Sequence, residues 1–135
     1  MASVPAKKRD SVYESFLATP DHLVAEIIRG ELRTHSRPAI PHAWTASLLG
    51  VHLGGPFDLG KGGPGGWIVL GGPELHLAGS IFVPDLAAWR RERMPELPAV
   101  PFIELAPDWS CEVLSPSTAP TRCQSTRAPW CATLG

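Results

Sequence analysis

Two carboxylates interrupt otherwise apolar stretches of this chain, and carboxylates are ligands that hard divalent cations prefer. Asp85 lies within residues 81–89, and Glu112 lies within residues 109–114. Burying a carboxylate among apolar residues is costly unless it is paired or coordinates a metal. We therefore predict that the two stretches form adjacent strands and that their carboxylates form a divalent-cation site. The simpler alternatives are an Asp that starts a turn after Pro84 and a Glu that points to water.

Short apolar runs predict a sheet around these carboxylates. Strands are expected at residues 66–70, 74–77, 81–89 and 109–114. The last two runs are rich in β-branched and aromatic residues and are bounded by proline and glycine, as is typical of strands. In the second run, alternation places Glu74 and His76 on the same face.

A tight hairpin is predicted upstream, with Arg29 and Gly30 at its turn. Residues 23–28 and 31–35 flank this turn, where glycine accepts a positive φ at little cost. A continuous helix over residues 21–34 is the competing interpretation, because Glu and Leu favour helices.

Two helices complete the expected elements. Residues 11–18 form the first, with Ser11 and Glu14 at the spacing of a capping box. The second begins at Pro41, where a missing N–H costs nothing, and ends at Gly54. His42 therefore falls in the first turn of this second helix.

Length and composition indicate one domain without an overall basic field. The chain has 135 residues, 44% of them hydrophobic, and a net charge of −1. No apolar run approaches the roughly 20 residues needed to cross a bilayer. Residues 1–10 read as a disordered tail without the apolar segment of a secretory signal. We therefore expect a cytoplasmic protein with no membrane partner.

The positions of the cysteines and arginines bear on which kinds of site the chain can form. The three cysteines, Cys111, Cys123 and Cys131, are odd in number and show no CxxC pattern, which argues against a disulfide framework and a zinc site. Residues 90–93 hold the only basic cluster in the middle of the chain. That cluster either contacts nucleic-acid phosphates or is simply solvated.

Two motifs carry a resemblance to a known family. They are Val83-Pro84-Asp85-Leu86 and the string Cys111-Glu112-Val113-Leu114-Ser115-Pro116-Ser117-Thr118. Together they resemble the PD-(D/E)XK nuclease superfamily, and more closely its branch of restriction endonucleases labelled domain of unknown function 820. Weaker similarity lies in residues 25–32, in Pro41-His42 and in Pro73-Glu74-Leu75. The resemblance covers about residues 10–119.

The resemblance implies an α/β (α+β) domain over residues 11–118, with a mainly antiparallel, restriction-endonuclease-like sheet flanked by helices. It implies metal-dependent endonuclease activity on DNA, with Mg²⁺ or Mn²⁺ held by Asp85, Glu112 and a neighbouring backbone carbonyl. Glu74 matches a third acidic position of the family. Glu26 and His42 match positions that support the site. Assembly into a homodimer is one possible oligomeric state.

The family pattern fails after residue 118. Residues 119–135 contain no Asp, Glu or Lys, and Pro120 and Pro129 disfavour the helix expected there. Leu114 stands where the strict superfamily pattern has a lysine, the resembled branch instead has its lysine on the helix that follows, and no lysine follows Lys61 in this chain. We therefore expect a truncated or frameshifted C-terminus and impaired turnover. The alternative function is a catalytically inactive, nuclease-like remnant that acts as a binding or dimerisation module.

Overall fold

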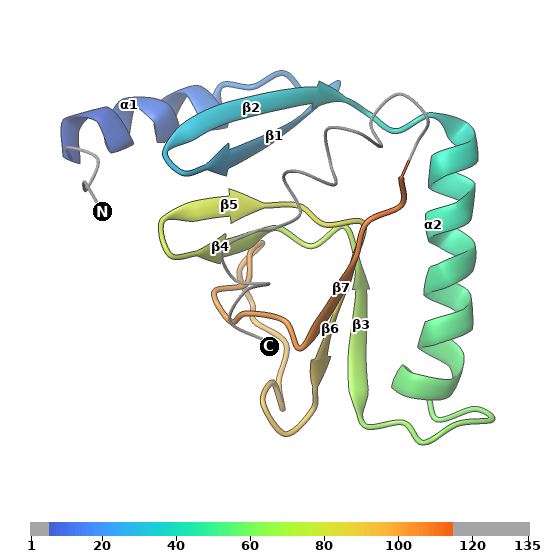
Figure 1. Cartoon of the computed structure of the whole chain (residues 1–135). Helices are drawn as coiled ribbons and strands as arrows, with labels where there is room; N and C mark the ends of the chain where they lie inside the picture. The colour runs from blue at the N-terminus through green and yellow to red at the C-terminus, as the bar shows by residue number, and fades with distance from the viewer. Residues whose placement is uncertain (1–5, 115–135) are drawn as a thin grey trace.

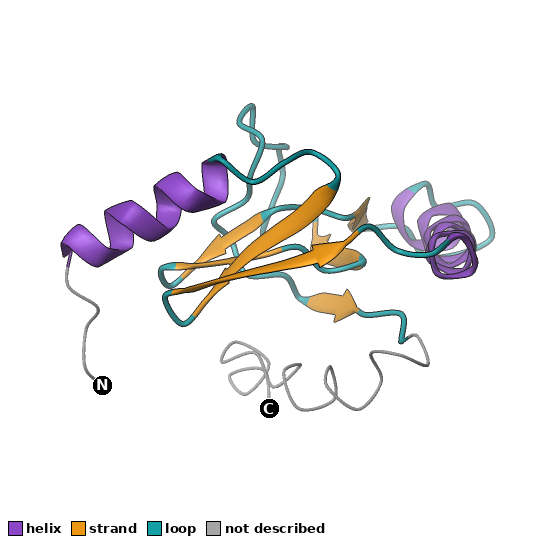
Figure 2. Cartoon of the chain, turned by 90° about the horizontal axis from the view of Figure 1, so that it is seen from above, coloured by secondary structure: helices purple, strands orange, loops and turns teal. Residues whose placement is uncertain are grey.

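The computed structural model of the chain describes residues 6–114 (Figure 1). Its elements are α1 (Ala6–Leu17), β1 (Leu23–Ile28), β2 (Glu31–Ser36), α2 (Ile40–Leu53), a π-helical turn η1 (Gly54–Asp58), β3 (Trp67–Gly71), β4 (Leu75–Leu77), β5 (Ser80–Phe82), β6 (Leu86–Arg90) and β7 (Trp109–Cys111). The strands form two antiparallel sheets, with α1 and α2 on opposite sides of them (Figure 2). This arrangement confirms the predicted mixed α+β class.

The first sheet has the strand order β2-β1-β5-β4 and is built from two hairpins. Arg29 and Gly30 adopt φ values of 53° and 78°, the positive angles that a two-residue hairpin turn requires. The predicted hairpin is thereby confirmed, and the alternative of a continuous helix is wrong. Ile27 pairs with Ile81 and so joins the two hairpins.

The second sheet has the order β3-β6-β7, with β6 in the centre. Ile68 lies opposite Trp89, and Leu86 lies opposite Cys111. Residues 86–89 are all buried, as expected of a central strand covered on both faces. α2 lies against β3, at the edge of this sheet (Figure 1).

The predicted single strand over residues 81–89 is wrong, because the chain changes sheets in the middle of it. β5 ends at Phe82 in the first sheet, and β6 begins at Leu86 in the second. Pro84 has no N–H to donate to a sheet ladder, so a strand does not continue through it readily. Asp85 therefore lies at the junction of the two sheets instead of inside one strand.

The core gathers side chains from both sheets and from the long connection between β6 and β7. Its buried members are Ile68, Leu75, Leu77, Phe82, Ala87, Trp89, Met94 and Ile103. Trp89 is fully buried, and its Nε1 donates a hydrogen bond of 2.9 Å to the carbonyl of Leu105. The chain segment that holds Asp85 is thus anchored to the core through β6.

Two further element boundaries, the start of α1 and the end of β7, differ from the predictions. α1 begins at Ala6 instead of Ser11, because the alanine, lysine and arginine residues before Asp10 are strong helix formers, so residues 6–10 are not a disordered tail. The end of α2 is as predicted, because the helix stops at Leu53 and Gly54 is its C-cap; Gly54 keeps a right-handed helical φ of −64° and leads into η1. β7 ends at Cys111, so Glu112 follows the strand directly.

Two further expectations concern membrane-spanning helices and the C-terminal residues. In residues 6–114, neither helix is both long and apolar enough to cross a bilayer. The irregular C-terminus expected at residues 119–135 lies outside the described residues.

Candidate metal centre

Asp85 contacts the main chain of the second motif directly. Pairing of β6 with β7 places Leu86 opposite Cys111, so the residues flanking this pair also meet. The amide N–H of Val113 donates a hydrogen bond of 2.7 Å to Oδ2 of Asp85. The Asp85 side chain is only 14% exposed. The two sequence motifs are therefore joined at the junction of the two sheets.

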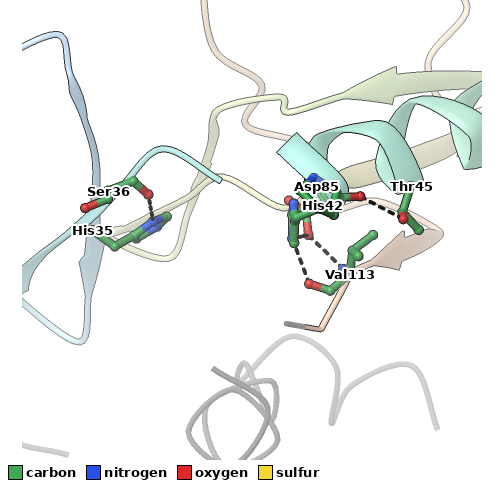
Figure 3. A network of polar contacts seen from close by, with 7 residues as sticks. His35, Ser36, His42, Thr45, Asp85 and Val113 are labelled. Atoms are coloured by element: carbon green, nitrogen blue, oxygen red, sulfur yellow. Dashed lines mark hydrogen bonds and ion pairs between the residues drawn. The ribbon is translucent and has the colours of Figure 1, made fainter. Parts of the chain in front are cut away.

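His42 closes this contact from the first turn of α2 (Figure 3). Its Nε2 atom lies 2.7 Å from the carbonyl oxygen of Val113 and 3.2 Å from Oδ2 of Asp85. The side chain is 9% exposed. The structure thus brings His42 together with Asp85.

Glu112 lies between Cys111, which pairs with Leu86 of β6, and Val113, whose amide donates to Asp85. It is half-buried. Burial raises the pKa of the Cys111 thiol, and the negative charges of Asp85 and then Glu112 raise that pKa further. The influence of Asp85 on this thiol agrees with the β6–β7 pairing, which sets Leu86 opposite Cys111.

Glu26 supports the junction between the sheets from β1. Its Oε1 accepts a hydrogen bond of 3.0 Å from the amide N–H of Val83, two residues before Asp85. Its Oε2 lies 3.6 Å from Nε2 of His35 in β2. Sequence reasoning missed His35 as a partner, although the hairpin register sets it diagonally opposite Glu26.

Glu74 has a different partner. Its Oε1 lies 2.7 Å from Nε2 of His76, as their shared face predicts, and His76 stacks on Phe102 with ring centroids 4.1 Å apart. Among residues 6–114, no three His, Cys, Asp or Glu side chains are grouped so that they could hold one metal ion. The assignment of Glu74 to the Asp85 site stays a prediction.

The oxygen donors near Asp85 nevertheless have the chemistry that Mg²⁺ or Mn²⁺ requires. Mg²⁺ is usually held by one or two carboxylates, with waters and substrate phosphate completing its coordination. Asp85 and Glu112 carry carboxylates, and Val113 carries a main-chain carbonyl, which are oxygen donors of these types. This donor set fits a hard divalent cation.

A pocket of about 420 Å³ opens beside Asp85. Its walls are Ala46, Ser47 and Gly50 of α2, Val69 and Gly71 of β3, and Leu86 of β6. Sequence reasoning missed this pocket. The feature of the sequence that could have indicated the pocket is the group of small residues at positions 46, 47 and 50, which a helix places on one side.

The basic cluster at residues 90–93 is engaged within the protein. Arg91 pairs with Asp58 at 2.5 Å, and Arg93 pairs with Asp108 at 2.7 Å. The guanidinium of Arg90 lies over the ring of Trp67, 5.2 Å from its centroid. These intramolecular contacts favour a structural role for the cluster over phosphate binding.

Comparison with solved structures identifies a similar fold. A nuclease from Anabaena variabilis, described as putative and as belonging to domain of unknown function 820, superposes with a TM-score of 0.68 at 19% identity. The match covers 85% of this chain but only 64% of that chain. No curated protein matches the sequence.

The sequence also matches a protein family over most of its length. The match is to the Uma2 family, described as "Putative restriction endonuclease", and it covers residues 13–135. It thus extends beyond residue 119, where the motif resemblance ends. The chain belongs to the Uma2 family.

Proposed function

We propose that this protein hydrolyses DNA phosphodiester bonds with the help of Mg²⁺ or Mn²⁺ bound at Asp85 and Glu112. The observation that carries the proposal is the 2.7 Å hydrogen bond from Val113 to Asp85, which joins the two motifs at one place. Membership of a family described as restriction endonucleases supports DNA as the substrate. Glu26 supports the site through Val83, and Glu74 remains the third acidic candidate.

The proposed chemistry depends on charge. Asp85 and Glu112 by themselves repel a phosphate, and the arginines at residues 90–93 are engaged with Asp58, Asp108 and Trp67. A divalent cation, when bound, acts as a Lewis acid on the phosphate and lowers the pKa of coordinated water. The chain contributes the carboxylates and the Val113 carbonyl that hold the cation, beside a pocket open to substrate.

We further propose that turnover is slow, because no lysine follows Lys61 to serve from the helix after the second motif, as in the resembled branch, or from the strict superfamily position, which is Leu114. An ammonium at that position would orient water or stabilise developing negative charge. Leu114 is 48% exposed and offers an apolar side chain instead. Cation binding and DNA binding do not need this ammonium, so they persist while catalysis is weak.

Calorimetric titration of Mn²⁺ and Mg²⁺ tests the site itself. The wild-type protein is expected to bind saturably, and Glu112→Gln is expected to weaken binding at least about tenfold because a charged ligand is lost. Glu96→Gln is the matched control, since Glu96 is an exposed carboxylate in the loop after β6, and its binding should equal that of the wild type. A plasmid-nicking assay run in parallel reports turnover.

The outcomes of this titration separate the two candidate functions. A wild-type protein that melts cooperatively but binds neither cation would contradict the proposal and favour the inactive binding or dimerisation module. Binding with equal affinity by Glu112→Gln would remove Glu112 from the site.

Leu114→Lys is expected to raise the nicking rate by about 10- to 100-fold, because it supplies the missing positive charge beside Glu112. The measurement is the initial rate of plasmid nicking at saturating Mn²⁺. Leu97→Lys, which makes the same substitution at another exposed leucine, is the control for a general gain of DNA affinity. Equal gains in both variants would attribute the effect to net charge and not to the site.

A further inference from the structure

We infer that His42 is a positioning residue, which holds Val113 and with it Glu112 against Asp85. The observation is that both main-chain polar groups of Val113, its N–H and its carbonyl, contact a side chain of another element. Its N–H donates to Asp85, and its carbonyl oxygen lies 2.7 Å from His42 Nε2 (Figure 3). Asp85 lies at the junction of the two sheets, Val113 lies two residues after β7, and His42 lies in the first turn of α2.

The strand ladder does not reach Val113. The pairing between β6 and β7 ends with Leu86 and Cys111, and Val113 follows two residues later. Main-chain groups that leave a ladder need other partners if they are shielded from water. Asp85 and His42 provide those partners for Val113. The Val113 main chain is therefore held by these two side chains.

The chemistry of the imidazole fixes the direction of the contact. Nε2 faces a carbonyl oxygen and a carboxylate oxygen, both acceptors, so Nε2 must carry the hydrogen. The shorter distance, 2.7 Å against 3.2 Å, assigns the hydrogen bond to Val113. In the described chain, the buried Nδ1 atom of His42 has no hydrogen-bond partner. The hydrogen bond made by Nε2 therefore orients the imidazole ring of His42.

α2 presents His42 from a well-defined first turn. Pro41 occupies one of the first two helical positions, where its fixed φ favours helix entry. The Thr45 hydroxyl donates a hydrogen bond of 2.9 Å to the Pro41 carbonyl, one turn away. The donor atom of His42 therefore projects from a regular helical turn toward the Val113 carbonyl, which lies beyond the end of β7.

Positioning by His42 has a consequence for the cation site, and this part rests on the proposed function. A carbonyl oxygen has two lone pairs, so Val113 can accept from His42 and still offer the second pair to a cation. A histidine that orients such a donor influences cation affinity without being a ligand. Losing it frees Val113 to turn away, and the adjacent Glu112 moves with it.

Hydrogen exchange at the Val113 amide, measured by NMR without any cation, tests the positioning itself. His42→Ala should accelerate exchange by about tenfold, the effect of losing one hydrogen bond. His42→Gln retains an N–H donor at a similar reach and should stay within about threefold of the wild type. His52→Ala alters an exposed histidine at the other end of α2 and should change nothing. Unchanged Val113 exchange in His42→Ala would overturn the inference.

Calorimetric Mn²⁺ titration of the same variants tests the link to the site. His42→Ala should weaken binding by about 10- to 100-fold, as is typical when a residue that orients a ligand is lost, and His42→Gln should restore most of it. Failure of the wild type to bind Mn²⁺ would defeat the proposed function but leave the exchange result standing. If His42→Ala unfolds, His42→Leu, which keeps most of the volume without a donor, replaces it in both experiments.

Discussion

Asp85→Ala is expected to abolish divalent-cation binding and to lower the DNA-nicking rate at least about 100-fold, the scale of losing one stabilising group at a reacting centre. Asp85 would supply one of the two carboxylates of the proposed site, and it is the acceptor for the Val113 amide. The substitution therefore removes both a ligand and an anchor of the second motif. The measurement is the nicking rate at several Mn²⁺ concentrations, because lost affinity and lost turnover respond differently to added cation.

A second variant separates the two roles of Asp85. Asn at this position keeps an oxygen that can accept from Val113 but loses the charge. Asp85→Asn should therefore melt close to the wild type while still failing to bind cation. Asp85→Ala should lose a further 1.5–3 kcal/mol or so, the usual worth of a hydrogen bond to a charged group. Asp21→Ala, at an exposed carboxylate, is the control. Normal nicking by Asp85→Ala would rule out the proposed site.

Trp89→Ala is expected to reduce the free energy of unfolding by about 3–5 kcal/mol, the usual cost of truncating a buried aromatic side chain to alanine. Trp89 is fully buried, and its removal also leaves the Leu105 carbonyl without its donor. Domains are typically stable by only about 5–15 kcal/mol, so this change consumes much of the total. Because β6 carries both Trp89 and the residues after Asp85, the site should be lost as the sheet unfolds.

Urea unfolding followed by circular dichroism measures this effect. Trp44→Ala is the matched control, since it makes the same substitution at a tryptophan of α2 that is 66% exposed. A surface change of this kind should alter the free energy of unfolding by no more than about 0.5 kcal/mol. Equal destabilisation by both substitutions would contradict the position of Trp89 in the core.

Local features of the fold could be predicted from the sequence because they depend on neighbours along the chain. The turn at Arg29 and Gly30 follows from glycine's tolerance of positive φ, and the start of α2 follows from Pro41. The pairing of Glu74 with His76 follows from the two-residue period of a strand. The motifs around Asp85 and Glu112 likewise directed attention to the correct pair of strands, β6 and β7.

The remaining features depend on how separate elements pack. The apolar run at residues 81–89 predicted one strand, but the two-sheet arrangement shows that the chain passes from one sheet to the other at Pro84. The contact of His42 with Val113 spans 71 residues, and that of Glu26 with Val83 spans 57. No local preference encodes such distances. The sequence by itself determined which residues are candidates for the chemistry, while the tertiary structure decided which of them meet, because contacts between distant segments arise only when sheets and helices pack around a common core.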